Sequence, residues 1–242
     1  MLSLITLIST IFILWFIVST TYPNLLKSPI DVLGYFQSVP PQRILLSVAK
    51  TLTNSLIGFF IALILAEISA FLAYLNDFLD SFFTAVNTLV QSVSVLVWAL
   101  IFIIVFGVLS PIPPILVASA SSYPILLSAM LSVTKSLDRK FIEISNTLGA
   151  SKVQEYIYII LPGSVPHLAS AARSAIGIAL RISVVAEALG GSGGIGYELM
   201  YNYNLGIVEG VLAWAILLIL LMIVLDVLIL RPIEKWAERW LI

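Results

Sequence analysis

The feature that most limits how this chain can fold is a succession of apolar runs, each about as long as a membrane crossing. A hydrocarbon core about 30 Å thick requires about 20 consecutive apolar residues in a helix. Because lipid cannot bond an exposed backbone N–H or C=O group, each such run must be helical. The sequence therefore predicts an all-α membrane protein, a single domain over residues 1–242. We expect six transmembrane helices, at about 2–20, 51–75, 84–106, 114–134, 167–188 and 207–230.

Composition agrees with a membrane protein and excludes several other classes. The chain is 60% hydrophobic and 10% charged, whereas soluble domains are about 25% charged. Its net charge of −1 gives no indication of a nucleic-acid partner, and the absence of cysteine excludes disulfides and thiol chemistry. The first apolar run lacks a basic segment before it and a small-residue cleavage site after it, so we expect a retained helix rather than a signal peptide.

The distribution of Lys and Arg predicts how the helices are oriented. With six helices both termini lie on the same side of the membrane, and basic residues are enriched in cytoplasmic loops. The expected terminal side carries Lys135, Arg139, Lys140, Lys152, Arg231, Lys235 and Arg239; the opposite side carries Lys27, Arg43 and Lys50. We therefore expect both termini, and the connection at 135–165, in the cytoplasm.

The connection at 135–165 has the signals of two short helices joined by a turn. Asp138 can cap a first helix beginning at Arg139. Apolar residues recur in it at helical spacing, at Phe141, Ile144 and Leu148.

Gly149 follows where a left-handed residue ends a helix, and Ser151-x-x-Gln154 is typical of a capping box that begins a second one. Leu161-Pro162 is expected to end that second helix, since proline disfavours a helical residue before it. This pattern predicts a cytoplasmic helix–turn–helix hairpin.

The same connection resembles a known motif. Glu143, Gly149, Ile159, Leu161 and Pro162 stand at the spacing of the EAA loop of ABC-importer permeases, E-A-A-x3-G-x9-I-x-L-P, although Ile144 and Ser145 replace the two alanines. In that family the loop couples the membrane subunit to a separate ATPase. The resemblance implies this coupling role for Glu143, Ile144, Ser145, Leu148, Gly149, Ala150, Leu161 and Pro162.

Further segments resemble the nitrate/sulfonate/taurine subfamily of these permeases. They are Ser28-Pro29 with Val32, Thr51-Leu52 with Gly58-Phe59, and Ala186-Glu187 with Gly194 to Tyr197. The resemblance implies a type I importer permease that moves a small, often anionic solute by alternating access. The implied partners are a cytoplasmic ABC ATPase dimer that carries ATP and Mg²⁺, a second permease copy, and an external solute-binding protein. The chain has no GxxxxGK[ST] sequence, so we expect no cofactor of its own and no catalytic or metal site.

Five ionisable residues lie inside or at the edge of apolar runs: Glu67, Arg173, Arg181, Glu187 and Asp226. Charges at such depth are costly and usually face protein or water. Arg173 is close enough to the end of its run to reach the cytoplasmic surface. Arg181 either pairs with Glu67 or Asp226 or lines the solute pathway, where its planar guanidinium would favour an anion. Glu187 either acts in a gate or holds a neighbouring helix.

Other polar and aromatic positions have two interpretations each. Ser92, Ser94 and Trp98 either line the pathway or pack helices together through small residues. The subfamily often has a proline where this chain has Ser92-Val93-Ser94, which leaves a break in this helix open. His167 is expected to be an interfacial polar residue.

Two terminal features have simpler interpretations. Gly191 to Gly196 formally matches GxGxxG but joins two membrane helices, so we interpret it as a flexible turn. Trp236 and Trp240, four residues apart in a charged tail, indicate an amphipathic anchor on the membrane surface.

Two further functional classes are alternatives to the permease interpretation. A secondary transporter or channel would have no ATPase partner, and inverted repeats with charged broken helices would support it. A membrane enzyme would need a clustered nucleophile, base or metal set. The hairpin motif favours a permease subunit of an ATP-driven importer, which is not itself an enzyme.

Overall fold

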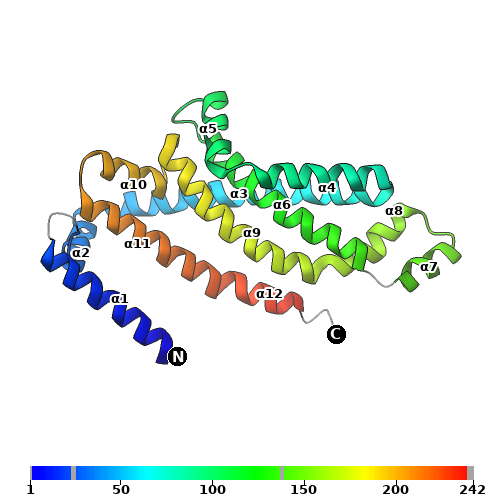
Figure 1. Ribbon diagram of the computed structural model, residues 1–242, viewed down its shortest axis with the longest axis horizontal. Helices are drawn as coiled ribbons and strands as arrows, with labels where there is room; N and C mark the ends of the chain where they lie inside the picture. The colour runs from blue at the N-terminus through cyan, green and yellow to red at the C-terminus, as the bar shows by residue number, and fades with distance from the viewer. Residues whose placement is uncertain (1, 23–25, 137–138, 239–242) are drawn as a thin grey trace.

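The computed structural model describes residues 2–22, 26–136 and 139–238, and the regular elements in these ranges are all helical (Figure 1). The elements are α1 (Leu2–Thr21), α2 (Pro29–Ser38), α3 (Pro41–Leu75), α4 (Asp77–Ser92), α5 (Val95–Phe106), α6 (Ile112–Ser136), α7 (Arg139–Thr147), α8 (Lys152–Glu155), η1 (Tyr156–Ile160), α9 (Leu161–Gly190), α10 (Ile195–Asn204), α11 (Val208–Leu225), η2 (Asp226–Leu230) and α12 (Arg231–Glu238). The segments η1 and η2 are single π-helical turns within longer helices.

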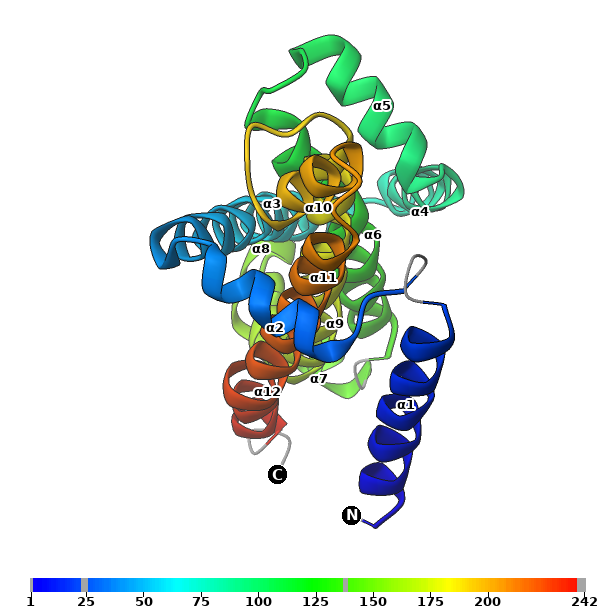
Figure 2. The same ribbon diagram turned by 90° about the vertical axis from the view of Figure 1, so that its left-hand side faces the viewer.

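The centre of the bundle is formed by α3, α6 and α9, which run side by side in both views (Figures 1 and 2). Small residues recur every fourth position on the buried face of α3, at Gly58, Ala62, Ala66 and Ala70. A Cβ added at Gly58 would lie 2.5 Å from the carbonyl oxygen of Ile115 on α6. Small residues therefore let these helices approach closely, as they do in membrane bundles generally.

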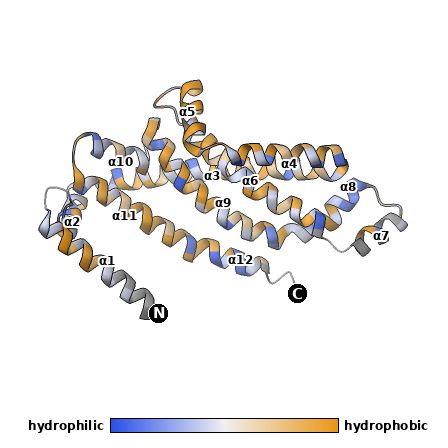
Figure 3. Ribbon diagram, in the orientation of Figure 1, coloured by the Kyte–Doolittle hydropathy of each residue, from blue (hydrophilic) through white to orange (hydrophobic). Residues whose placement is uncertain are grey.

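Four helical segments of the described chain are long and apolar enough to cross a membrane: Pro41–Leu75, Ile112–Lys135, Lys152–Gly190 and Val208–Ala237. The bent pair α4 and α5 raises the number to five if it counts as one span. Hydrophobic residues predominate along α4, α5 and α11, while hydrophilic residues gather near α8, α10 and α12 (Figure 3). The helical class is confirmed; α1 as a sixth span and the cytoplasmic position of both termini stay predictions.

The helix expected at 84–106 is divided in two, at the position where the sequence left a break open. The chain bends by 92° between α4 and α5, because Val93 and Ser94 both adopt extended backbone conformations. The Ser92 hydroxyl donates a 2.8 Å hydrogen bond to the Leu89 carbonyl as α4 ends, an interaction by which serine competes with helical bonding. A break therefore forms here without a proline.

The expectation that Leu161-Pro162 ends the second hairpin helix is wrong. Residues Lys152–Gly190 form one continuous helical segment. In the wide turn of η1 the Leu161 N–H bonds to the carbonyl of Tyr156, five residues earlier. This local change in bonding lets the helix continue through Pro162, which has no N–H group to contribute.

Two connections predicted as loops contain helices. Ser28 and Asp31 form a capping box at the start of α2, and Pro41 occupies the first turn of α3, where a missing N–H costs nothing. The Gly-rich turn leads directly into α10. At the other end of the chain, α12 continues the helix of α11 instead of forming a separate anchor. The predicted Asp138 cap and Trp240 lie outside the described residues.

Candidate functional site

The hairpin formed by α7 and α8 projects from one end of the bundle, opposite to α2 and α10 (Figure 1). Gly149 has a φ of 75°, the left-handed conformation predicted for it. The Ala150 N–H donates a 3.0 Å hydrogen bond to the Ser145 carbonyl, which closes α7 in a Schellman motif. Ser151 and Gln154 form the predicted capping box at the start of α8. The predicted turn at Gly149 and the capping box of Ser151 with Gln154 are therefore confirmed.

The hairpin presents a large apolar surface to solvent. Phe141 is 56% exposed, Ile144 58% and Leu148 82%. Isolated exposed apolar residues are ordinary, but a contiguous apolar patch on a polar element indicates a binding surface. An amphipathic helix of this kind fits the groove of a partner protein.

The residues predicted to couple to an ATPase fall into three groups. Glu143, Ile144, Leu148 and Gly149 are exposed on the hairpin, and Ala150 is partly buried there. Ser145 points inward and is buried. Leu161 and Pro162 lie at the start of α9, away from the turn of the hairpin.

Sequence reasoning missed Glu155, which lies behind the hairpin and is 3% exposed. Its carboxylate accepts a 2.8 Å hydrogen bond from the Tyr74 hydroxyl on α3 and another from the Ser145 hydroxyl on α7. About two helical turns nearer the bundle centre on α3, Glu67 accepts a 2.9 Å hydrogen bond from the Tyr156 hydroxyl. In the sequence, an acid in a first helical turn merely suits the helix dipole, so no local signal marks Glu155.

At the opposite end of the bundle Glu187 is 1% exposed. It accepts hydrogen bonds of 2.8 Å from the Thr51 hydroxyl and from the Asn54 amide, and one of 3.2 Å from the Gly196 N–H. A Cβ at Gly194 would clash with the Glu187 carboxylate. The Gly-rich turn is therefore a close-packed wall around a buried carboxylate, and Glu187 joins α9 to α3 and α10.

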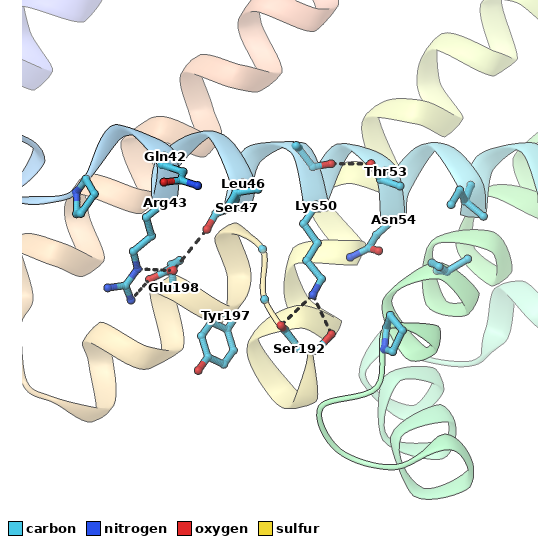
Figure 4. A pocket seen from close by; sticks show the side chains of 17 residues that line it. Gln42, Arg43, Leu46, Ser47, Lys50, Thr53, Asn54, Ser192, Tyr197 and Glu198 are labelled. Carbon is cyan, nitrogen blue, oxygen red and sulfur yellow. Dashed lines mark hydrogen bonds and ion pairs between the residues drawn. The ribbon is translucent and has the colours of Figure 1, made fainter.

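A second polar cluster lies farther out on α3 (Figure 4). Arg43 forms a two-pronged ion pair with Glu198 on α10, with N–O distances of 2.7 and 2.8 Å. Lys50 donates hydrogen bonds to the carbonyl and hydroxyl of Ser192. These residues border an open cavity of about 900 Å³ between α3 and the Gly-rich turn.

The two intramembrane arginines differ from expectation. The Arg173 side chain, expected to extend to the cytoplasmic surface, instead pairs with Asp226 at 2.8 Å and with Glu234 at 2.6 Å. These ion pairs join α9 to the end of the last helix. Of the two alternatives for Arg181, the pairing with Glu67 or Asp226 is not found in the described residues, since those acids bond to Tyr156 and to two other arginines.

Within the described chain Arg181 has no hydrogen-bond or ion-pair partner. It lies on an open face of α9, in a groove of about 580 Å³ toward α11. A place for Arg181 on the solute pathway stays a prediction.

Trp98 lines a cavity of about 480 Å³ between the bend of α4 and α5 and helices α6 and α9. Its indole N–H is buried and has no acceptor in the described structure. Ser121, Ser128 and Gln91 add polar groups to walls that are otherwise mostly aliphatic. Ser92 and Ser94 are exposed at the bend itself. Trp98 therefore combines a buried, unpaired N–H with a place beside a space large enough for a small molecule.

The last candidates are His167 and a metal site. His167 is exposed near the start of α9. Across the three described ranges, no group of three or more His, Asp or Glu side chains gathers where it could hold a metal ion.

Comparison with known proteins agrees with the geometry. Residues 58–231 match the family described as "Binding-protein-dependent transport system inner membrane component". The chain is 29% identical over 135 residues to a protein of Escherichia coli named as an aliphatic sulfonates transport permease, SsuC, covering 56% of this chain and 51% of the relative. It is 31% identical over 84 residues to the nitrate import permease NrtB of Synechococcus elongatus, covering 35% and 30%.

The chain thus spans about half the length of these relatives, or less. Among solved structures, an inward-facing MetNI methionine ABC transporter superimposes with a TM-score of 0.68 over 82% of this chain and 96% of the other, at 17% identity. At that identity the likeness concerns the fold alone.

Proposed function

Because the chain belongs to the family of binding-protein-dependent transport system inner membrane components, we propose that it moves a small anionic solute into the cell under the control of a separate ATPase. It is a non-catalytic, multi-pass permease subunit of the inner membrane. The chain has no phosphate-binding GxxxxGK[ST] sequence, so the energy source is a partner. The alternative of a secondary transporter or channel has no comparable support.

The observation that carries this proposal is the exposed apolar face of the hairpin. Ile144 and Leu148 are held outward by a glycine turn, on an element that projects from the bundle. A surface of this kind fits a groove on a cytoplasmic ATPase dimer. The hairpin is joined without interruption to α9, so a displacement of the docked hairpin is transmitted into the membrane.

The open face of α9 supports a second permease copy and a pathway between the copies. Ser170, Ser174, Arg181 and Val185 are exposed at spacings of four, seven and four residues, which places them on one helical face. An arginine and two serines suit contact with protein or water better than with lipid. We propose that two identical chains meet near this face, with an external solute-binding protein delivering solute from the side of α2 and α10.

The donors near this face favour an anionic solute. Arg181 supplies a charge without a partner, and Trp98 supplies a buried N–H without an acceptor. Ser92 and Ser94 lie at the adjoining bend, and we include them in the proposed pathway. Glu187 takes part in another way: buried among donors from α3 and α10, it holds the outer end of α9 in position. The relatives are named for aliphatic sulfonates and nitrate, which are anions.

Co-purification tests the proposal. The tagged chain, extracted from its native membranes in mild detergent, is expected to bring down a polypeptide with a phosphate-binding loop and ATP-hydrolysing activity. Gly149→Val is expected to lose this partner, because a β-branched residue is strained at a φ of 75° and displaces the hairpin.

Gly206→Val is the matched control, since Gly206 also has a positive φ, 70°, and also has open space around it, but lies at the other end of the bundle. Equal recovery of the ATPase with the Gly149→Val and Gly206→Val variants would contradict the proposal. Failure of the unmodified chain and of both variants to bring down an ATPase would contradict it as well.

A further inference from the structure

The hairpin is joined to the end of α3 by two hydrogen bonds that run in opposite directions. Tyr74 on α3 donates to Glu155 on α8, at 2.8 Å, and Tyr156 on η1 donates to Glu67 on α3, at 2.9 Å. Ser145 adds α7 to the same set through its bond to Glu155. We call these five residues, Glu67, Tyr74, Ser145, Glu155 and Tyr156, the brace.

Three members of the brace are shielded from solvent, and the other two, Glu67 and Tyr74, are partly buried. Glu155 and Tyr156 are each 3% exposed and Ser145 is 7% exposed. Hydrogen bonds to carboxylates are stronger than neutral ones, and more so away from water. The ring of Phe71 packs edge-on against Tyr156, with centroids 5.0 Å apart.

The terminal carbonyl of α3 is also held by the hairpin. The Lys152 ammonium on α8 donates a 3.0 Å hydrogen bond to the carbonyl oxygen of Leu75. A cation at this position interacts favourably with the carboxyl end of a helix. Charged, aromatic and backbone groups therefore all fix the hairpin to the same end of α3.

The other end of α3 is also joined to the outer part of the bundle, by hydrogen bonds and an ion pair. Thr51 and Asn54 bond to Glu187 on α9, and Arg43 pairs with Glu198 on α10. Both sets of attachments lie on α3, one uninterrupted helix of 35 residues, about 52 Å long at 1.5 Å per residue. A helix of this length, fixed at both ends, is suited to carry a displacement from one end to the other.

We propose that the brace makes the coupling hairpin and α3 move as one body, so that a displacement imposed on the hairpin reaches the outer clusters along α3 as well as along α9. This inference rests on the proposed function, because it assumes an ATPase that moves the hairpin. The five residues of the brace are positioning residues, since none is proposed to touch solute or nucleotide. Ser145 in particular acts from inside the hairpin rather than on the docking surface.

Pairs of spin labels measure the proposed motion directly, and the chain has no native cysteine to interfere. Thr147→Cys marks the hairpin, Ile64→Cys marks α3 and Ile219→Cys marks α11; all three residues are exposed. Labelled chains are diluted with unlabelled chain, and distances are compared without nucleotide and after trapping with ATP and vanadate. Co-purification of the ATPase, measured first, tests the proposed function separately.

In the unmodified chain the distance from 147 to 64 is expected to stay fixed on trapping, while the distance from 147 to 219 shifts. Tyr74→Phe combined with Tyr156→Phe removes only the two donor hydroxyls, and the 147–64 distance is then expected to change on trapping. Glu155→Gln, which keeps all the rings, is expected to have the same effect. Tyr158→Phe combined with Tyr203→Phe is the matched control, because these tyrosines are 75% and 69% exposed.

Two results would overturn the brace while leaving the proposed function intact. One is a 147–64 distance that changes on trapping in the unmodified chain with its ATPase bound. The other is a distance that stays fixed in the brace variants. Loss of the ATPase from every preparation would instead overturn the proposed function, and the brace with it.

Discussion

Thr51, ten residues into α3, donates a 2.8 Å hydrogen bond to the carboxylate of Glu187 and accepts one of 2.8 Å from the Ile195 N–H. One hydroxyl therefore joins α3 to the outer end of α9 and to the start of α10. Thr51 is fully buried. If its hydroxyl were removed, water could not reach the two partners to replace the lost hydrogen bonds.

We expect Thr51→Val to lower the free energy of unfolding by about 1–3 kcal/mol, the typical cost of leaving buried polar groups unpaired. Thermal denaturation of the purified chain in detergent measures this effect. Thr53→Val is the control, because the Thr53 hydroxyl is exposed and bonds within its own helix; its effect should stay within about 0.5 kcal/mol. Equal effects of the two changes would contradict the buried cluster.

Gly196→Ala should disrupt the packing of α10 on α9. The added Cβ would clash with the carbonyl oxygen of Val184 and would lie 2.8 Å from the Cβ of Glu187. Backbone cannot move aside as a flexible side chain can, so we expect a cost at the upper end of the range for overpacking, about 3 kcal/mol. The yield of monodisperse protein in detergent and its midpoint of thermal unfolding report the loss.

Gly34→Ala serves as the comparison for Gly196→Ala, since nothing lies within 4 Å of a Cβ at Gly34. If Gly196→Ala were tolerated as well as Gly34→Ala, the close contact described for the Gly-rich turn would be incorrect.

Arg181→Gln should reduce uptake of an anionic solute while leaving ATPase binding and basal ATP hydrolysis unchanged. A charge-assisted contact is worth about 1.5–3 kcal/mol, so uptake of nitrate or a short alkanesulfonate should fall by about tenfold or more. Uptake into vesicles and ATP hydrolysis are measured on the same preparation.

Lys235→Gln removes the same charge from an exposed position on α12 and should leave uptake unaltered. Normal uptake by the Arg181→Gln variant would remove Arg181 from the pathway.

The parts of the fold that the sequence predicts are those decided by neighbours along the chain. The turn at Gly149 and the capping box of Ser151 with Gln154 depend on residues within a few positions of each other, and both are present. Apolar run length likewise predicted the helical class, because lipid admits few alternatives.

The parts that escaped prediction depend on distant residues or on competing local preferences. Tyr74 and Glu155 are 81 positions apart, and nothing near either residue indicates the other. The pairing of Asp226 with Arg173 instead of Arg181 was decided by how α11 and α12 lie against α9. At Pro162 a π-helical turn kept the helix intact, and at Ser94 two extended residues broke one without proline.

The side of the membrane on which the hairpin lies is the most direct test of the central claim, that the hairpin docks on a cytoplasmic ATPase. Leu148→Cys and Leu205→Cys each place one thiol on an exposed leucine, 82% and 56% exposed, at opposite ends of the bundle. Cells from which any outer barrier has been removed, but whose inner membrane is sealed, are treated with a membrane-impermeant maleimide. The reagent should label position 205 at once, and position 148 only after the membrane is opened. Labelling of position 148 in sealed cells, with position 205 protected, would contradict the account.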